Sequence, residues 1–193
     1  MGKPATVERA TDRDAVNASM VLAFAADPVF RWIYPDSRAY VRDFPGFVAA
    51  LGGPAFEIGE TWQVDDHAAA SIWLPPGVRA DPELILSHLL ATCPAEKLDE
   101  MMQIGMQMGE HHPTFPHWYL VWLGVDANRQ GQGLGARLIQ HTLRKVDESG
   151  LPAYLESPNP RSIPFYQRHG FEVIGMTRTA TASPIHFMLR PPR

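Results

Sequence analysis

The chain has 193 residues, of which 45% are hydrophobic and 20% are charged, as in ordinary globular proteins. This length predicts one domain over residues 1–193. A formal net charge of -4 and the absence of long basic runs argue against a nucleic-acid partner. The single cysteine, the lack of a secretory leader and the lack of an apolar run of about 20 residues predict a cytoplasmic protein without membrane contact.

The first part of the chain predicts a strand, two helices and a loop between the helices. Residues 6–10 have strand character, and a capping pattern with an apolar periodicity predicts a helix over 11–26. Asp27 and Pro28 end this helix because the residue before a proline avoids the helical conformation. An aromatic segment, residues 30–35, is predicted to form a loop before a second helix over 37–51.

The middle of the chain predicts a hairpin and a broken helix. The Gly-Gly-Pro run at 52–54 is expected to end the second helix. Residues 61–64 and 68–74 have strand character and are separated by a short polar turn, which predicts an antiparallel pair. A helical region then extends over 81–111 with a break at Pro94.

A glycine-rich loop connects a predicted strand to a predicted helix in the last part of the chain. The strand, residues 117–125, is an apolar run, and the helix is amphipathic to about Ser149. Glycines let the backbone approach a ligand, and the N–H groups at a helix start favour an anion. The arrangement therefore predicts a pyrophosphate site. The loop consists of Gln130, Gly131, Gln132, Gly133, Leu134, Gly135 and Ala136.

The same loop matches a second nucleotide-binding pattern. Gly131, Gly133 and Ala136 satisfy G-x-G-x-x-[GA], and Glu156 follows near the end of the next predicted strand, as in a Rossmann domain. That fold requires several more strand-helix units after its first glycine loop. The residues after Ala136 have room for one parallel strand, a short helix and a hairpin, so the chain length argues against this alternative.

A second motif follows the glycine loop, and the two together resemble a known family. The segment 159–171 reads N-P-R-S-I-P-F-Y-Q-R-H-G-F. The GCN5-related N-acetyltransferase (GNAT) superfamily has [RQ]-x-x-G-x-[GA] followed by a motif close to N-x-x-[AS]-x-x-x-Y-x-x-x-G-F. The matching positions, in the same order, are Gln130, Gly133, Gly135, Asn159, Ser162, Tyr166, Gly170 and Phe171.

Within that superfamily the chain most resembles the puromycin N-acetyltransferase type, and this resemblance covers most of its length. The architecture transfers more safely than the substrate of that type. The similar segments are the opening strand and helix, residues 23–28, 72–74, 117–120 and 164–166.

The resemblance implies a mixed α/β GNAT fold, with a largely antiparallel sheet that splays apart between its strands 4 and 5 and is flanked by helices. It implies that acetyl-CoA binds in the gap, with its pantetheine beside the backbone of Leu123 and Val125 and its pyrophosphate on residues 130–136. Asn159, Ser162 and Tyr166 are expected to contact the cofactor from the other side.

The chemistry implied by the resemblance is direct attack of an amine on the thioester, with Tyr166 as general acid. A phenol is protonated at neutral pH and can donate its proton to a departing thiolate. Many members carry a glutamate on the strand before the phosphate loop, whereas the matching face here presents Tyr119, Val121 and Leu123. The alternatives for a general base are Glu57, Glu60, His117 and Glu156.

An aromatic wall is predicted on the acceptor side, and it suits a small amphipathic amine. The residues expected to contact the acceptor are Phe30, Arg31, Trp32, Tyr34, Tyr119 and the late hairpin around 177–183. Acetylation of a small-molecule amine is the favoured function. Acetylation of a protein or peptide amine and non-catalytic acyl-CoA binding are the alternatives. The three histidines at 111, 112 and 117 lack the spacing of a zinc site, so no metal is expected, and a homodimer is one open alternative for the oligomeric state.

Overall fold

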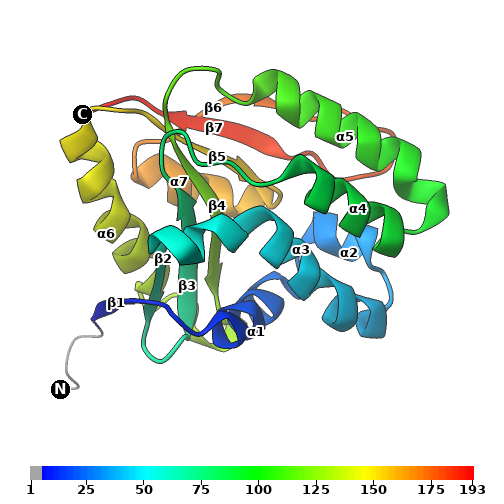
Figure 1. Cartoon of the computed structure of the whole chain (residues 1–193), viewed down its shortest axis with the longest axis horizontal. Helices are drawn as coiled ribbons and strands as arrows, with labels where there is room; N and C mark the ends of the chain where they lie inside the picture. The colour runs from blue at the N-terminus through cyan, green and yellow to red at the C-terminus, as the bar shows by residue number, and fades with distance from the viewer. Residues whose placement is uncertain (1–5) are drawn as a thin grey trace.

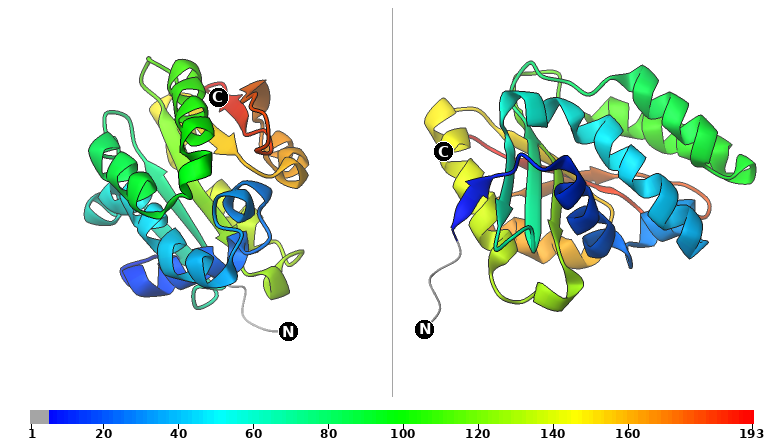
Figure 2. Two further views of the ribbon diagram at one scale, coloured as in Figure 1. Left: turned by 90° about the vertical axis from the view of Figure 1, so that its right-hand side faces the viewer. Right: turned by 60° about the horizontal axis from the view of Figure 1, so that its bottom comes forward.

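The computed structural model describes residues 6–193, which form one seven-stranded sheet with helices on both faces (Figures 1 and 2). The strand order is β1-β2-β3-β4-β5-β7-β6, and all neighbours are antiparallel except β4 and β5. The predicted mixed sheet is therefore confirmed, and the parallel sheet of a Rossmann domain is excluded. The strands are β1 (Val7–Arg9), β2 (Thr61–Val64), β3 (Ala69–Leu74), β4 (Trp118–Val125), β5 (Ala153–Ser157), β6 (Glu172–Met176) and β7 (His186–Arg190).

The helices divide between the two faces of the sheet. Helices α1 and α3 pack against β3 and β4 on one face, and α6 packs on the other face with α7 beside it. The helices are α1 (Arg13–Phe24), α2 (Pro28–Ile33), α3 (Ser37–Ile58), α4 (Pro82–Thr92), α5 (Leu98–His111), α6 (Leu134–Ser149) and α7 (Ile163–Arg168), with single 3₁₀ turns at 95–97, 127–129 and 160–162.

Each face has its own apolar core. On the α1 and α3 side, Phe30, Phe44 and Trp122 meet with ring centroids 4.7–5.6 Å apart. On the α6 side, Trp73 and Leu155 pack against the apolar stripe of that helix. The predicted hairpin is present, because β2 and β3 pair with Val64 opposite Ala69.

Helix α3 continues through the glycine and proline residues that were predicted to end it. It stops at Gly59, whose φ of 77° breaks the helical conformation. Gly52 is buried, and a Cβ there would lie 3.0 Å from Ile72 and 3.2 Å from Trp122. The close approach of α3 to the sheet therefore outweighs the low helix propensity of Gly52-Gly53-Pro54.

The aromatic segment after α1 is a short helix, α2, and not the predicted loop. Asp27 caps this helix by accepting hydrogen bonds from the N–H groups of Val29 and Phe30, at 3.0 and 3.2 Å. Proline occupies its first position, where no N–H is needed. Phe30 and Tyr34 are buried. The apolar side chains of this segment therefore join the core, and only part of the segment remains available to contact a ligand.

Strand β4 contains a bulge that its sequence does not reveal. Ile72 of β3 pairs with Trp122, but the next residue, Trp73, pairs with Leu120, so Val121 is an extra residue on β4. The inward and outward alternation shifts by one residue at this point. As a result, Val121 and Trp122 pack on the α1 and α3 side, whereas Leu123 packs on the α6 side. The predicted common face of Tyr119, Val121 and Leu123 is therefore wrong for Leu123.

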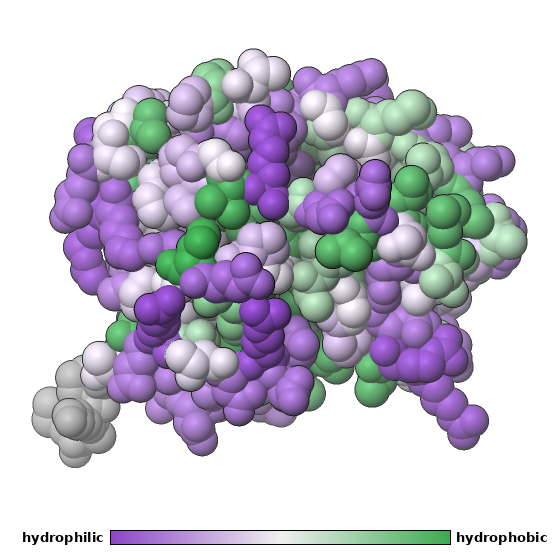
Figure 3. Space-filling model, viewed as in Figure 1, coloured by the Kyte–Doolittle hydropathy of each residue, from purple (hydrophilic) through white to green (hydrophobic). Residues whose placement is uncertain are grey.

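The surface over α4 is apolar (Figure 3). Leu84, Leu86 and Leu90 are exposed on this helix, which has no buried residue of its own. No helix in residues 6–193 combines the length and the apolar character needed to cross a membrane.

Candidate active site

The sheet opens between β4 and β5. The two strands pair only where Trp118, Tyr119 and Leu120 lie beside Ala153, Tyr154 and Leu155, at the start of each strand. Beyond Leu120, in the described chain, the second half of β4 pairs with β3 alone. A cavity of about 720 Å³ occupies the opening and extends from the glycine loop to α1 and α2.

The glycine loop forms one end of this cavity. Gly131 and Gly133 have φ values of 76° and 79°, and nothing lies within 4 Å of where their Cβ atoms would be. Gly133 immediately precedes α6 and offers no side-chain cap, so the first N–H groups of the helix stay available to an anion. Three arginines that the sequence analysis did not single out also line the cavity: Arg129, Arg161 and Arg168.

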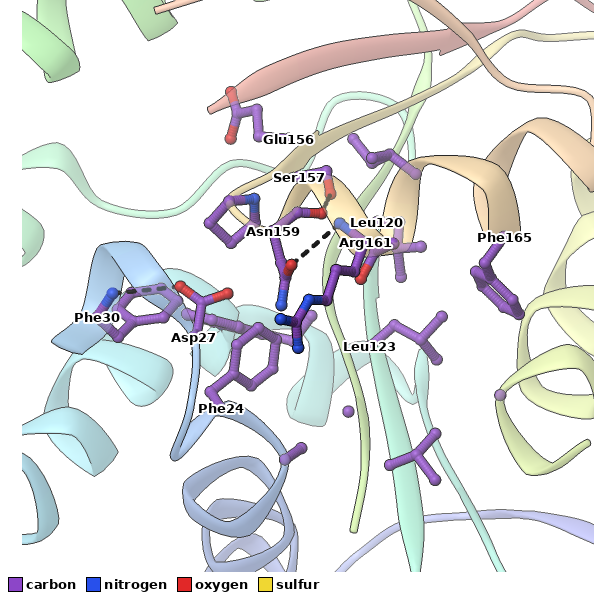
Figure 4. A pocket seen from close by; sticks show the side chains of 18 of the residues that line it. Phe24, Asp27, Phe30, Leu120, Leu123, Glu156, Ser157, Asn159, Arg161 and Phe165 are labelled. Atoms are coloured by element: carbon purple, nitrogen blue, oxygen red, sulfur yellow. Dashed lines mark hydrogen bonds between the residues drawn. The ribbon is translucent and has the colours of Figure 1, made fainter. Parts of the chain in front are cut away.

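The segment after β5 forms the opposite wall (Figure 4). The Asn159 side chain points into the cavity, and its Oδ1 accepts a hydrogen bond of 3.1 Å from the N–H of Arg161. The hydroxyl of Ser157 donates to the carbonyl of Asn159 at 3.1 Å. Tyr166 lines the same wall, and burial together with the negative charge of Asp27 raises the pKa of its phenol.

Comparison with known proteins identifies the family of this chain. The model of the acetyltransferase (GNAT) family matches residues 54–171. An uncharacterized N-acetyltransferase of Schizosaccharomyces pombe is 38% identical over 212 aligned positions, which cover 95% of this chain and 81% of that protein. The chain belongs to the GNAT acetyltransferase family. It is therefore an N-acetyltransferase, an acyltransferase of a family that uses acetyl-CoA as donor.

Two further comparisons differ in what they establish about this acetyltransferase. The peptidyl-lysine N-acetyltransferase YjaB of Salmonella typhimurium is 28% identical over 107 positions, covering 53% of this chain and 67% of that protein. A solved structure of a histone acetyltransferase HPA2-related protein from Corynebacterium glutamicum has a TM-score of 0.68 and 24% identity, covering 98% of this chain and 97% of that one. The second likeness shows the fold alone.

The residues of the cavity fit the donor of the family. The unpaired edge of β4, from Val121 to Val125, has the backbone groups that a pantetheine amide needs. The start of α6, Arg161 and Arg168 offer N–H groups and positive charge for phosphates, whereas the Arg129 guanidinium is paired with Asp65. Each predicted donor-binding residue lines the cavity except Gln132, whose Oε1 instead accepts a hydrogen bond of 3.2 Å from Arg129.

The end of the cavity away from the glycine loop is apolar. Phe24, Phe30 and Trp122 form an aromatic wall with ring centroids 5.3–5.5 Å apart. Met108 and Ile104 from α5 also line it. This end suits the apolar part of an acceptor.

Only some of the residues predicted to contact the acceptor line the cavity. Phe30 and Tyr119 line the cavity, whereas Arg31, Trp32 and Tyr34 are absent from its described walls. Arg31 donates a hydrogen bond of 2.6 Å to the carbonyl of Pro35, and the Trp32 indole donates one of 3.0 Å to Thr181. The Tyr34 hydroxyl lies 3.0 Å from that of Thr92 on α4. The α2 helix turns these three side chains toward neighbouring elements.

The predicted alternatives for a base also fall in different places. Glu60 pairs with Lys145 at 2.7 Å, and Glu57 lies 3.8 Å from Arg13, both outside the described cavity walls. Glu156 lines the cavity at the end of β5. Its Oε2 accepts a hydrogen bond of 2.6 Å from Tyr119.

A buried polar cluster surrounds Glu156. The hydroxyl of Tyr154 donates to its Oε1 at 3.1 Å, and the Nδ1 of His112 lies 3.7 Å from the same oxygen. The two hydroxyls and the carboxylate satisfy each other, and the charge of Glu156 helps to raise the pKa of Tyr119. His117 lies 3.2 Å from His112 and lines a second cavity beside Tyr119 and Glu156. Within residues 6–193 no group of three acidic, histidine or cysteine side chains is arranged to hold a metal ion.

Asp27 is the acidic residue of this cavity that the sequence analysis missed. It is 3% exposed and stands between α1 and α2, facing the wall that carries Asn159 and Arg161 (Figure 4). Burial raises the pKa of its carboxyl to about 6, against the lowering effect of its two backbone hydrogen bonds. The Asp-Pro pair signalled a helix end, and only the fold brings its carboxylate to the cavity.

Proposed function

We propose that this chain transfers the acetyl group of acetyl-CoA to the amine of a small molecule, with Tyr166 as general acid. The observation that carries the proposal is one continuous cavity with two unlike ends. The glycine loop, Arg161 and Arg168 suit the phosphates of CoA, and the aromatic wall suits a compact apolar acceptor. The sequence resemblance to the puromycin N-acetyltransferase type supports a small acceptor.

In this proposal the chain holds the two reactants together and manages two protons. The acetyl thioester supplies the acyl group. As the new N–C bond forms and the C–S bond breaks, the nitrogen loses one proton and the sulfur gains one. Tyr166 donates from its hydroxyl, and the raised pKa of that phenol keeps the proton in place at neutral pH. A main-chain N–H near Leu123 polarises the acyl carbonyl as negative charge develops on it.

Acetylation of a protein or peptide is the second function. It is favoured by the Salmonella relative, whose name describes a peptidyl-lysine acetyltransferase. A peptide has to approach from outside, and α5, which lines the cavity with Ile104 and Met108, also exposes the apolar side chains of Met102 and Met106. The two functions differ in the size of the acceptor that the cavity accepts.

The test is acceptor profiling of the purified chain. Release of free CoA thiol from acetyl-CoA is followed with a panel of primary amines and, in parallel, with lysine-containing and free N-terminal peptides. We expect turnover with small apolar amines and little with peptides. Higher kcat/KM with peptides would favour the second function. CoA binding by calorimetry is measured alongside, and binding without transfer to any acceptor would favour a non-catalytic acyl-CoA module.

A further inference from the structure

In the described chain, only one oxygen of the Asp27 carboxylate accepts hydrogen bonds. Its Oδ1 accepts both hydrogen bonds that cap α2, from Val29 and Phe30. Among the described residues, Oδ2 takes part in no hydrogen bond or ion pair, and Figure 4 shows the carboxylate beside the open space in front of Asn159 and Arg161. The residue as a whole is only 3% exposed, so its unpaired oxygen has little contact with solvent, and a ligand group is its natural partner.

Capping alone does not require this buried charge. Asparagine caps a helix as well as aspartate does, because only the side-chain oxygen is used. Three other α-helices of the described chain are capped by exposed aspartates, Asp12, Asp36 and Asp81, which stay solvated. At Asp27 the same capping residue is placed inside the cavity, where ionisation is opposed by burial.

Few charged or titratable groups act on Asp27. The phenols of Tyr166 and Tyr40 both feel its negative charge, which raises their pKa values. The Arg161 guanidinium faces it across the cavity, yet no ion pair joins them in the described chain (Figure 4). Asp27 and Tyr166 therefore face one cavity from different walls, with space for a ligand between them.

We propose that Asp27 receives the amino group of the acceptor and takes its proton on Oδ2 as the N–C bond forms. Phe24, Phe30 and Trp122 then hold the rest of the acceptor, which makes a compact apolar primary amine the substrate class. The proton given up by the nitrogen passes through Asp27 to solvent. The thiolate receives its own proton from Tyr166, and the Tyr166 phenolate takes a proton back from solvent. This inference rests on the proposed function and adds the residue that selects the acceptor.

The test uses Asp27→Asn, which keeps the capping oxygen and removes the charge. Asp36→Asn is the matched control, because Asp36 caps α3 with a hydrogen bond of 2.9 Å to the N–H of Ala39 at an exposed position. Benzylamine is the acceptor probe. The kcat/KM for benzylamine is measured from about pH 5 to 8, together with acetyl-CoA and benzylamine affinities by calorimetry and melting temperatures for all three proteins.

We expect Asp27→Asn to lower kcat/KM by about 10²–10⁴ at pH 7.5 with unchanged acetyl-CoA affinity, as for loss of a general base. The ratio of wild-type to variant kcat/KM cancels the ionisation of the amine. Since the pKa of the Asp27 carboxyl is about 6, this ratio should rise with pH through that region and level off above it. A residue that only caps α2 gives a ratio independent of pH, and Asp36→Asn should give a ratio near one.

The failures of the two proposals are distinct. Transfer to benzylamine by the wild type, with equal kcat/KM or a pH-independent ratio in a folded Asp27→Asn protein, overturns the role of Asp27 and leaves the acetyltransferase proposal intact. No transfer by the wild type to any amine overturns the proposed function instead. Benzylamine affinity then decides the role of Asp27: at least tenfold weaker binding by Asp27→Asn supports it, and equal or absent binding overturns it.

Discussion

In the proposed mechanism, Tyr166 and Asp27 have opposite tasks within one buried environment. Burial raises the pKa of both groups. For the phenol, the increase preserves the proton that a departing thiolate needs. For the carboxyl, a pKa of about 6 leaves it ionised at neutral pH but makes it a stronger base than an exposed aspartate. General base catalysis is most effective when the pKa lies near the working pH, and the shift at Asp27 is in that direction.

Replacement of Tyr166 by phenylalanine isolates the hydroxyl. The ring continues to pack near Phe165 and Phe171, so the fold and the acetyl-CoA affinity should be retained. We expect kcat to fall by about 10²–10⁴ under conditions where chemistry limits turnover. Tyr34→Phe is the control, since the hydroxyl of Tyr34 contacts Thr92 outside the cavity. Near wild-type kcat in Tyr166→Phe would show that water protonates the thiolate.

The elements around the cavity depend on glycine for two different reasons. Gly131 and Gly133 have positive φ values and face open space, which suits a loop that wraps around a phosphate. Gly135 is buried in the first turn of α6, and a Cβ there would lie 3.3 Å from Val125 and 3.6 Å from Phe165. Gly135 thus allows α6 to pack closely against β4 and α7, in addition to lining the cavity.

Gly135→Val is consequently expected to disturb the fold as well as the site. Overpacking in a tight contact costs about 1–3 kcal/mol of unfolding free energy, and the shift of α6 should weaken CoA binding.

Gly53→Ala is the opposite case, because its Cβ meets nothing within 4 Å in the middle of α3. The Gly53→Ala substitution should raise the free energy of unfolding by about 0.5–1 kcal/mol. Urea unfolding measures both, and unchanged stability of Gly135→Val would assign that glycine to ligand approach alone.

At the scale of the whole molecule, the opening that creates the cavity weakens the sheet. The β1 to β4 part and the β5 to β7 part share a strand pair only at the start of β4 and β5. Buried Arg190 of β7 reinforces the assembly by donating two hydrogen bonds, at 2.7 and 3.0 Å, to the Asp147 carboxylate on α6. Its Nε also donates to the carbonyl of His169 at 3.0 Å, so one side chain connects β7, α6 and the end of α7.

Arg190→Ala should therefore destabilise the chain by about 1.5–3 kcal/mol, the usual contribution of hydrogen bonds to a charged group, because Arg190 is buried but the Asp147 carboxylate is 37% exposed and stays solvated. The exposed pair of Arg13 and Glu57, 3.8 Å apart, provides the control, and Arg13→Ala should change stability by less than about 1 kcal/mol. Chemical denaturation of both variants provides the comparison. If Arg190→Ala and Arg13→Ala lose the same unfolding free energy, packing of α6 alone joins the two parts of the sheet.

Local patterns in the sequence determined much of this protein. Capping residues, apolar periodicity and a polar turn predicted α1, α6 and the β2–β3 hairpin, because each depends on neighbours along the chain. The glycine loop and the later motif together indicated the family, since backbone contacts with a phosphate demand particular residues at particular spacings.

Only the tertiary structure decided the features that depend on distant residues. The bulge at Val121 exists through pairing with β3, and it placed Leu123 on the opposite face from the one predicted. Packing of Gly52 on the sheet carried α3 past its expected end. The sequence predicted only that Asp27 ends the first helix, and its burial opposite Tyr166 arises because the chain folds back over more than one hundred residues. Local signals determined α1, α6 and the hairpin, whereas long-range packing determined the extent of α3, the bulge of β4 and the environment of each side chain.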